Sequence, residues 1–181
     1  MSVKQLNAEV ARKIAAGEVI DRPNAIVREL MDNAVDSGAD HITVELTGGG
    51  IEKIRVVDNG CGMTKEDLFN CARPHATSKI SSETDLLNLT TLGFRGEALA
   101  SIISISKVTC TTRTKDYDYG TKVVCENSEV EHSKTGCAIG TIMQVENLFY
   151  NLPVRLKFLK SERTEYSYIS DLVTAIALSN P

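Results

Sequence analysis

Apolar residues recur at helical spacing between residues 23 and 37, which predicts a helix with one buried stripe. The positions of this stripe are Ile26, Val27, Leu30, Met31 and Ala34. Proline suits a first helical turn and glycine suits the residue after a last turn, so this helix should begin near Pro23 and stop at Ser37-Gly38. A shorter helix is predicted from Asn7 to Gly17, where a glycine follows the run AEVARKIAA.

Strand patterns surround and follow the longer helix. The segments HITVEL (41–46) and IEKIRVVD (51–58) predict two strands, and the intervening 47–50, TGGG, predicts a hairpin loop. The segments VTCTTRT (108–114), TKVVCE (121–126) and GTIMQVENLFY (140–150) predict an antiparallel meander with turns at Gly120 and Gly136. Thr64 with Asp67 resembles a capping box that opens a short helix, and the polar residues 73–84, which contain Pro74, predict a mobile loop. Residues 97–106 predict an apolar helix, and 153–178 predict a short basic helix followed by a longer amphipathic one.

The order of these elements predicts the fold class. Helices and strands occur in blocks and not in strict βαβ alternation, which favours an α+β domain whose helices cover one face of a mainly antiparallel sheet. The 181 residues, 42% of them hydrophobic, are enough for one compact domain with a sizeable core. A dinucleotide-binding fold of alternating strands and helices is disfavoured.

Composition and charge narrow the function classes. No apolar run is long enough to span a bilayer, and the first residues lack the apolar stretch of a signal peptide, so we expect no membrane partner. The five cysteines form no C-x-x-C pair, which suggests a reducing compartment and neither a zinc site nor a disulfide framework. The net charge of -4 argues against a dominant DNA-binding surface, so any DNA contact should be local or shared.

Glu29 and Asn33 are the first residues that suggest chemistry. Their spacing places a carboxylate and an amide side by side on one helical face. An amide oxygen can bind Mg²⁺, and a carboxylate one turn earlier can take a proton from an attacking water. The same spacing also occurs on ordinary solvated helix faces, so the pair by itself does not decide between the two interpretations.

Two glycine-containing segments could complete a nucleotide site. The segment DNGCGM places Asp58 at a strand end, where a carboxylate can accept a hydrogen bond from the amine of adenine, and Gly60 and Gly62 allow close approach of the base. An ordinary Asp-Asn-Gly turn would look the same. The segment TLGFRGEAL places glycines before a helix, where free N–H groups can hold phosphate, although a simple helix cap is the alternative.

Taken together, the order E-x-x-x-N, D-x-G-x-G and G-F-R-G-E-A-L resembles the GHKL ATPases, a superfamily of topoisomerases, chaperones, histidine kinases and MutL proteins. The strings IAAGEVIDRPNAIVREL, HATSKI, FRGEALASI and GTIMQVENLFYNLPVRLKFL are similar to the MutL family in particular. The resemblance covers essentially the whole chain. Pro74, just before His75, departs from the family pattern at the lid.

The resemblance implies a role for each matching residue. Glu29 matches the catalytic general base, Asn33 the Mg²⁺ ligand and Asp58 the adenine-binding aspartate. The other residues expected to bind the nucleotide are Gly60, Gly62 and Met63 at the base, Thr77, Ser78 and Lys79 in the lid, Gly93, Phe94, Arg95, Gly96, Glu97, Ala98 and Leu99 at the phosphates, and Thr141 near Asp58.

The resemblance also implies a fold and a function. It predicts a two-layer α/β sandwich of the GHKL (Bergerat) type that binds and slowly hydrolyses Mg-ATP as a dimerisation switch in DNA mismatch repair. The expected partners are a MutS-type mismatch-recognition protein, DNA, and a second MutL-type chain in a homodimer or heterodimer. The expected location is the cytoplasm or nucleoid of a bacterium, or the nucleus of a eukaryote. Residues 1–181 are expected to form one ATP-binding subdomain, ending before a second subdomain that carries a phosphate-contacting lysine.

Other interpretations stay open at this point. The chain could belong to another GHKL branch, such as a topoisomerase ATPase or a kinase, or to a relative that does not hydrolyse ATP. Cys61 is interpreted as a small buried residue and not as a reactive thiol. The basic run Arg155, Lys157, Lys160 and Arg163 could contact DNA phosphates, but a solvated helix face is slightly favoured. Among the histidines only His75 is given a function, through the lid.

Overall fold

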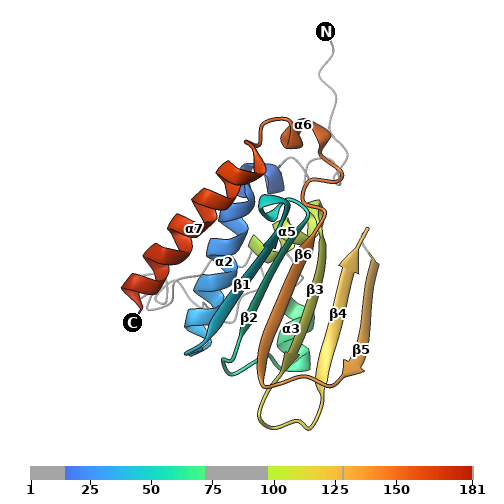
Figure 1. Cartoon of the computed structure of the whole chain (residues 1–181). Helices are drawn as coiled ribbons and strands as arrows, with labels where there is room; N and C mark the ends of the chain where they lie inside the picture. Colours follow the sequence, from blue (N-terminus) through green and yellow to red (C-terminus); the bar gives the residue numbers. More distant parts are fainter. Residues whose placement is uncertain (1–14, 72–97, 128, 181) are drawn as a thin grey trace, which may run out of the picture.

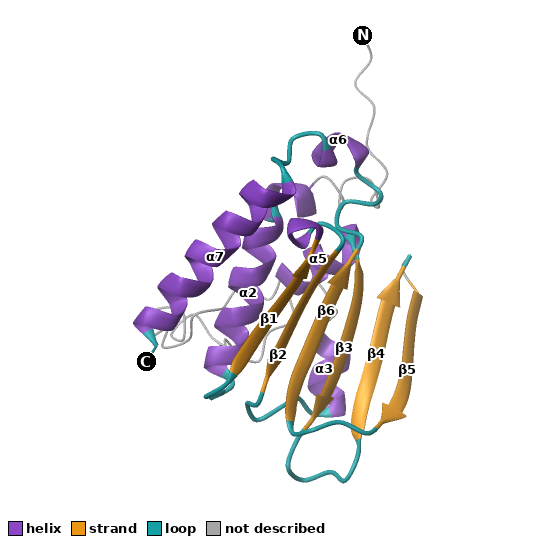
Figure 2. Cartoon of the chain, viewed as in Figure 1, coloured by secondary structure: helices purple, strands orange, loops and turns teal. Residues whose placement is uncertain are grey.

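The computed structural model describes residues 15–71, 98–127 and 129–180. In these ranges it shows a six-stranded sheet with the helices packed on one face (Figures 1 and 2). The strands are β1 (Ile42–Thr47), β2 (Lys53–Asp58), β3 (Lys107–Arg113), β4 (Gly120–Glu126), β5 (Glu129–Thr135) and β6 (Gly140–Glu146). Their order in the sheet is β1-β2-β6-β3-β4-β5, and every pairing between them is antiparallel. The expected α+β sandwich is therefore confirmed.

The helical layer is built from elements that are spread along the chain. Its elements are α2 (Pro23–Asp36), the 3-10 turn η1 (Gly48–Gly50), α3 (Lys65–Cys71), α5 (Ala98–Ile105), α6 (Pro153–Leu156) and α7 (Glu162–Ser179). Helices α2 and α7 lie side by side, and η1 packs against the start of α7. Among the helices of the described ranges, none has the length and apolar character of a membrane span.

Helix α2 follows its sequence pattern closely. The apolar stripe from Ile26 to Ala34 is buried, while Glu29 is half-buried and Asn33 is exposed on another face. Pro23 occupies the first turn, where its missing N–H leaves no helical hydrogen bond unmade. The helix ends at Asp36, and the N–H of Ser37 donates to the carbonyl of Asn33 at 3.0 Å. The stripe fixes which face of α2 meets the sheet, and so fixes where Glu29 lies.

The core consists of side chains that alternate along the central strands. Two apolar rows cross β2, β6 and β3 on the helical side, and the register pairs their members directly. One row is Ile54, Val145 and Val108, and the next is Val56, Met143 and Cys110. The following row lies at the strand ends and is polar, which makes it the natural place to look for a site.

The strand order differs from the expected meander. Strand β6 lies between β2 and β3 instead of at the end of the sheet, and its inward residues Thr141, Met143 and Val145 are all buried there. Strand β5 was not predicted, since all but one of its residues are exposed and its sequence EVEHSKT shows no period-two pattern. Gly120 is the first residue of β4 and pairs with Thr135, so it does not form the turn.

Three further expectations concern the segments 7–17, 64–67 and 73–84. The predicted helix 7–17 falls partly outside the described residues, but residues 15–19 are helical, so the helix runs two residues past Gly17. Thr64 caps α3 as predicted, because its hydroxyl accepts the N–H of Asp67 at 3.1 Å and donates to the Asp67 carboxylate at 2.7 Å. The proposed loop 73–84 lies outside the described residues.

Candidate functional site

A polar row crosses the ends of three adjacent strands on the face that the helices cover. Asp58 at the end of β2 pairs with Thr141 of β6, and Thr141 pairs with Thr112 of β3. Thr112 and Thr141 are 2% and 7% exposed, and Asp58 is half-buried. The row continues the apolar core rows, so its polar groups must find partners in one another or in a ligand.

The carboxylate of Asp58 is held through one of its two oxygens. The N–H groups of Gly60 and Thr141 both donate to Oδ1, at 2.9 and 3.1 Å. Oδ2 receives no hydrogen bond from the described residues. Burial raises the pKa of Asp58 above its usual value, and the two backbone hydrogen bonds oppose this effect without cancelling it. The carboxylate therefore offers Oδ2 as an oriented acceptor in a partly desolvated position.

The turn after Asp58 fits tightly between α2 and β3. The N–H of Cys61 donates to the carbonyl of Ser37 at 3.0 Å, and a Cβ at Gly60 would collide with Ser37. Gly62 has a φ of +72°, and a Cβ there would collide with the carbonyl of Arg113. Only glycine fits these two positions, because the backbone approaches its neighbours more closely than a side chain allows.

Thr112 is a member of the site that sequence reasoning missed. Its hydroxyl accepts the N–H of Met63 at 2.8 Å, donates to the carbonyl of Gly140 at 3.0 Å, and lies 3.1 Å from the hydroxyl of Thr141. The available signal was a hydroxyl at the third inward position of a strand whose other inward residues are Val108 and Cys110. A polar residue in a row of core positions is unusual unless it has a functional or structural role.

Glu29 and Asn33 meet on α2 as their spacing predicts. The side-chain amide of Asn33 donates to Oε1 of Glu29 at 3.2 Å, so its amide nitrogen is turned toward the carboxylate. Asn33 lies one turn before Ser37, where the Asp58 turn is attached, and Glu29 lies about 12 Å from Ser37 along the helix axis. The pair thus lies further along α2 from the Asp58 turn than Ser37 does.

Many of the sequence-predicted site residues lie outside the described ranges. These are the lid residues Thr77, Ser78 and Lys79 and the loop residues Gly93, Phe94, Arg95, Gly96 and Glu97. Ala98 is the first described residue of α5 and is half-buried. The side chain of Leu99 packs against the core beside Leu68 and Met143, so a ligand would meet its backbone and not its side chain.

Other candidates from the sequence have clear positions. Cys61 is exposed, which contradicts its interpretation as a buried filler, because Gly60 occupies the tight place against α2. Arg155 is half-buried, and a Cβ at Gly17 would lie 3.2 Å from its Nε, whereas Lys157, Lys160 and Arg163 are exposed. In the described part of the chain, no group of three His, Cys, Asp or Glu side chains could hold a metal ion.

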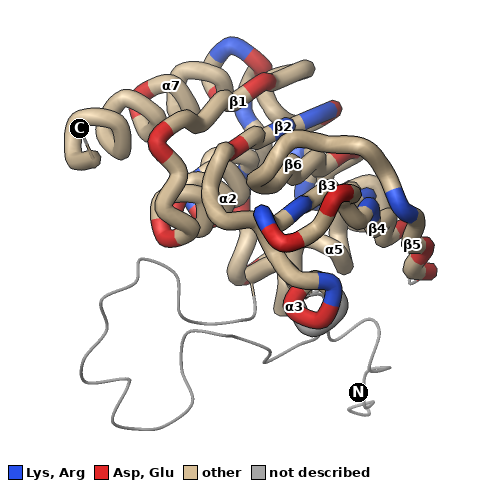
Figure 3. The backbone as a smooth tube through the Cα atoms, turned by 90° about the horizontal axis from the view of Figure 1, so that it is seen from below, with Lys and Arg blue, Asp and Glu red and all other residues tan. Residues whose placement is uncertain are grey.

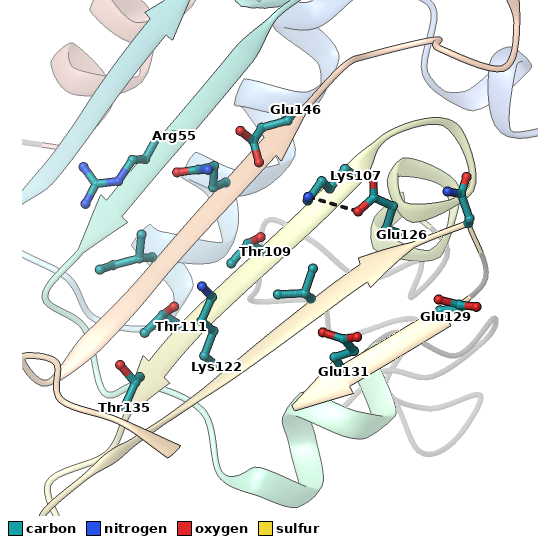
Figure 4. A pocket seen from close by; sticks show the side chains of 14 residues that line it. Arg55, Lys107, Thr109, Thr111, Lys122, Glu126, Glu129, Glu131, Thr135 and Glu146 are labelled. Atoms are coloured by element: carbon teal, nitrogen blue, oxygen red, sulfur yellow. Dashed lines mark ion pairs between the residues drawn. The ribbon is translucent and has the colours of Figure 1, made fainter. Parts of the chain in front are cut away.

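A separate hollow of about 690 Å³ lies on the open face of the sheet (Figure 4). Thr109, Thr111 and Gln144 line its floor, and Lys107 forms an ion pair with Glu126 at 3.0 Å across β3 and β4. None of its lining residues belongs to the Asp58 row, because alternate side chains of a strand point to opposite faces. It is therefore distinct from the candidate nucleotide site.

The sequence is similar to those of known proteins over most of its length. Residues 21–148 match the family described as "Histidine kinase-, DNA gyrase B-, and HSP90-like ATPase". The chain is 51% identical over 177 residues to the DNA mismatch repair protein MutL of Desulforamulus reducens, and 48% identical over 180 residues to that of Clostridium botulinum. These matches cover 97% and 99% of this chain but only 28% and 27% of the relatives, so the chain spans less than a third of their length.

Solved structures show the same relationship. The ATPase domain of Aquifex aeolicus MutL complexed with ADP is 32% identical, with a TM-score of 0.71, over 90% of this chain and 57% of that one. The N-terminal domain of a DNA repair protein is 33% identical, with a TM-score of 0.75, over 95% of this chain and 50% of that one. The residues that match the family model include the Glu29–Asn33 pair and the whole Asp58 row. This chain accordingly belongs to the histidine kinase, DNA gyrase B and HSP90-like ATPase family, and within that family it is similar to the ATPase domains of MutL proteins.

Proposed function

We propose that this chain binds Mg-ATP and hydrolyses it slowly, as the ATPase part of a MutL-type DNA mismatch repair protein. The observation that carries the proposal is the carboxylate of Asp58, in which Oδ1 takes two backbone N–H groups and Oδ2 is left to accept from a ligand. The exocyclic amine of adenine is a donor of the right kind. An ADP complex of the similar Aquifex aeolicus domain supports a nucleotide as the ligand.

Glu29 is proposed as the general base that takes a proton from the attacking water. It is half-buried on α2 and hydrogen-bonded to Asn33, an arrangement that holds the carboxylate in one orientation. Asn33 is proposed as a Mg²⁺ ligand through its amide oxygen, the branch that does not face Glu29. Amide and carboxylate oxygens fit Mg²⁺, which when bound would neutralise phosphate charge.

The triphosphate is proposed to lie toward the start of α5. Gly93 through Leu99 would hold it with backbone N–H groups, since free N–H groups at a helix start favour anions. Thr77, Ser78 and Lys79 would cover it as a lid whose ordering depends on nucleotide. These assignments rest on sequence resemblance for residues outside the described ranges.

In the whole protein, ATP binding is proposed to drive dimerisation that links mismatch recognition to strand processing. The partners would be a MutS-type protein, DNA, and a second MutL-type chain. Acidic and basic residues are interspersed along the described elements (Figure 3), so DNA contact would be local, with the exposed cations Lys157, Lys160 and Arg163 as candidates. A topoisomerase or kinase role would fit the family, but the names of the similar proteins favour mismatch repair.

The nucleotide chemistry can be tested in the full-length protein with Asp58→Asn, Glu29→Ala and the exposed control Glu129→Gln. Asp58→Asn keeps an oxygen for Gly60 and Thr141 but turns an NH₂ toward the adenine amine, so ATP affinity should fall roughly tenfold to a hundredfold. Glu29→Ala should bind ATP normally and lose hydrolysis by about 10²- to 10⁴-fold. Unchanged binding in Asp58→Asn and unchanged turnover in Glu29→Ala would refute the assignment.

The role in repair needs a separate test. In a host that lacks its own MutL-type protein, the full-length protein should lower the mutation rate, and Glu29→Ala and Asp58→Asn should not. A protein that hydrolyses ATP yet leaves the mutation rate unchanged would be an ATPase of another pathway.

Residues 1–181 by themselves are proposed to bind ATP weakly and turn it over poorly. The similar ATPase-domain structures are nearly twice as long as the part that matches this chain. The remainder is proposed to supply a lysine to the terminal phosphate, an electrostatic contribution commonly worth about 3 kcal/mol in a transition state. Equal turnover by residues 1–181 and by the full-length protein would contradict this proposal.

A further inference from the structure

Thr112 is a polar residue at a core position. Along β3, the side chains of Val108, Cys110 and Thr112 are buried on the helical side, while Thr109 and Thr111 face the open hollow (Figure 4). A methyl-bearing apolar residue would satisfy the pattern of this strand. The hydroxyl at this position therefore needs an explanation in the groups that it contacts.

The Thr112 hydroxyl uses its whole hydrogen-bonding capacity on groups around Asp58. A hydroxyl has one proton and two acceptor positions, and that of Thr112 contacts the N–H of Met63, the carbonyl of Gly140 and the hydroxyl of Thr141. Met63 belongs to the turn that follows Asp58, and Gly140 and Thr141 begin β6. One buried atom thus connects the two segments that hold the carboxylate.

Those two segments decide where the carboxylate oxygen points. The N–H of Thr141 donates to Oδ1 of Asp58, and so does the N–H of Gly60 in the turn that Met63 closes. If the Thr112 hydroxyl is removed, the N–H of Met63 loses its acceptor and Thr141 loses its side-chain neighbour. The two N–H groups that donate to Oδ1 can then shift, and the direction of Oδ2 changes with them.

We propose that Thr112 is a positioning residue that sets the preference of this site for a 6-aminopurine over a 6-oxopurine. This inference rests on the proposed binding of ATP at Asp58. A well-oriented acceptor distinguishes an amine, which donates, from an oxo group, which only accepts. A carboxylate with a wider range of orientations still binds a nucleotide but distinguishes the two bases less well.

The experiment measures the affinities of the full-length protein for ATP and for inosine triphosphate, which carries a 6-oxo group in place of the amine. Thr112→Val removes the hydroxyl at nearly constant shape, Thr112→Ser keeps it, and Thr111→Val makes the same change one residue away on the opposite face. Thermal unfolding without nucleotide is recorded for each variant. Should Thr112→Val fail to fold, Thr112→Cys provides a similar volume with a much weaker donor.

In Thr112→Val the ratio of ATP to inosine triphosphate affinity should fall about tenfold, the effect of one hydrogen bond. Thr112→Ser should keep the ratio within about twofold, and Thr111→Val should match the wild type. A ratio that stays at the wild-type value in Thr112→Val, even with a lower Tm, would show a purely structural role and overturn the inference. The proposed binding of ATP at Asp58 is tested independently, since it fails if Asp58→Asn binds ATP as the wild type does.

Discussion

Thr141 donates its backbone N–H to Oδ1 of Asp58 at 3.1 Å, although the two residues are 83 positions apart in the chain. The contact exists because β6 enters the sheet beside β2 and pairs these residues directly. Asp58 is thereby held by a strand that comes much later in the chain. Several measurable properties of the site depend on this relationship.

The raised pKa of Asp58 predicts opposite pH dependences for stability and for binding. The Asp58 carboxyl binds its proton more tightly in the folded state than in the unfolded chain. The contribution of Asp58 to the free energy of unfolding is therefore present at low pH. That contribution is lost as pH rises from the usual aspartate range through the raised pKa. ATP affinity should increase over the same interval, because the adenine amine needs the ionised carboxylate.

Thermal unfolding and ATP titration across this pH interval, in the wild type and in Asp58→Asn, check both signs. As pH rises, the Tm of the wild type should fall relative to that of Asp58→Asn. The pH dependence of ATP binding should disappear in the variant. A wild-type affinity that is flat through this interval would contradict the role of the ionised carboxylate.

Gly62→Ala should damage the base turn, because φ at Gly62 is +72° and an added Cβ meets the backbone carbonyl of Arg113. Gly38 is a matched control with a φ of +76° and open space around its Cβ position. Gly38→Ala should cost about 1–2 kcal/mol for the left-handed backbone alone. Gly62→Ala should cost more and weaken ATP binding at least tenfold, as urea unfolding and titration can measure. Equal effects of the two substitutions would show that the turn tolerates the collision.

Cys61 should react with thiol reagents more slowly when ATP is bound. Its thiol is exposed between Gly60 and Gly62, whereas Cys110 and Cys125 are buried in the sheet. A base seated at Asp58 would cover the turn and restrict access to the thiol. Alkylation of the peptide that contains residue 61, followed by mass spectrometry with and without Mg-ATP, gives the two rates. Asp58→Asn serves as the control at an ATP concentration below its weakened affinity, where its Cys61 should be alkylated at one rate with and without Mg-ATP.

Glu165 should stabilise the start of α7 through its oxygen and not through its charge. The residue is fully buried in α7, and its Oε1 accepts the N–H of Lys160 at 2.9 Å, while Oε2 has no partner among the described residues. Glu165→Ala leaves the Lys160 N–H without this acceptor and should lower the free energy of unfolding by about 1–3 kcal/mol. Glu165→Gln keeps the acceptor and should be at least as stable as the wild type in urea unfolding. A Gln variant as unstable as the Ala variant would assign the effect to the charge.

The sequence predicted the local parts of the site well. The limits of α2, its buried stripe, the Glu29–Asn33 adjacency, the β1–β2 hairpin and the Thr64 cap all follow from patterns within a few residues. Such patterns show which side chains share one face of a helix or strand. An apolar face will be buried wherever the segment packs, so this information is already present in each short segment. The fold class followed from the order of the segments and from the resemblance to a known family.

Other features could not be predicted because they depend on contacts between distant segments. The position of β6 between β2 and β3 is set by packing on both of its edges, and β5 pairs with β4 through its backbone while its side chains carry almost no pattern. The exposure of Cys61 and the inward direction of Leu99 depend on which neighbour occupies the nearest space.

By itself, the sequence determined which residue types stand at each strand end and helix face. Only the tertiary structure decided that Asp58, Thr141 and Thr112 form one row, because strand register is a property of paired strands and not of any single one. Thr112 was invisible in the sequence for the same reason: its hydroxyl acquires a role only when Met63, Gly140 and Thr141 are brought around it.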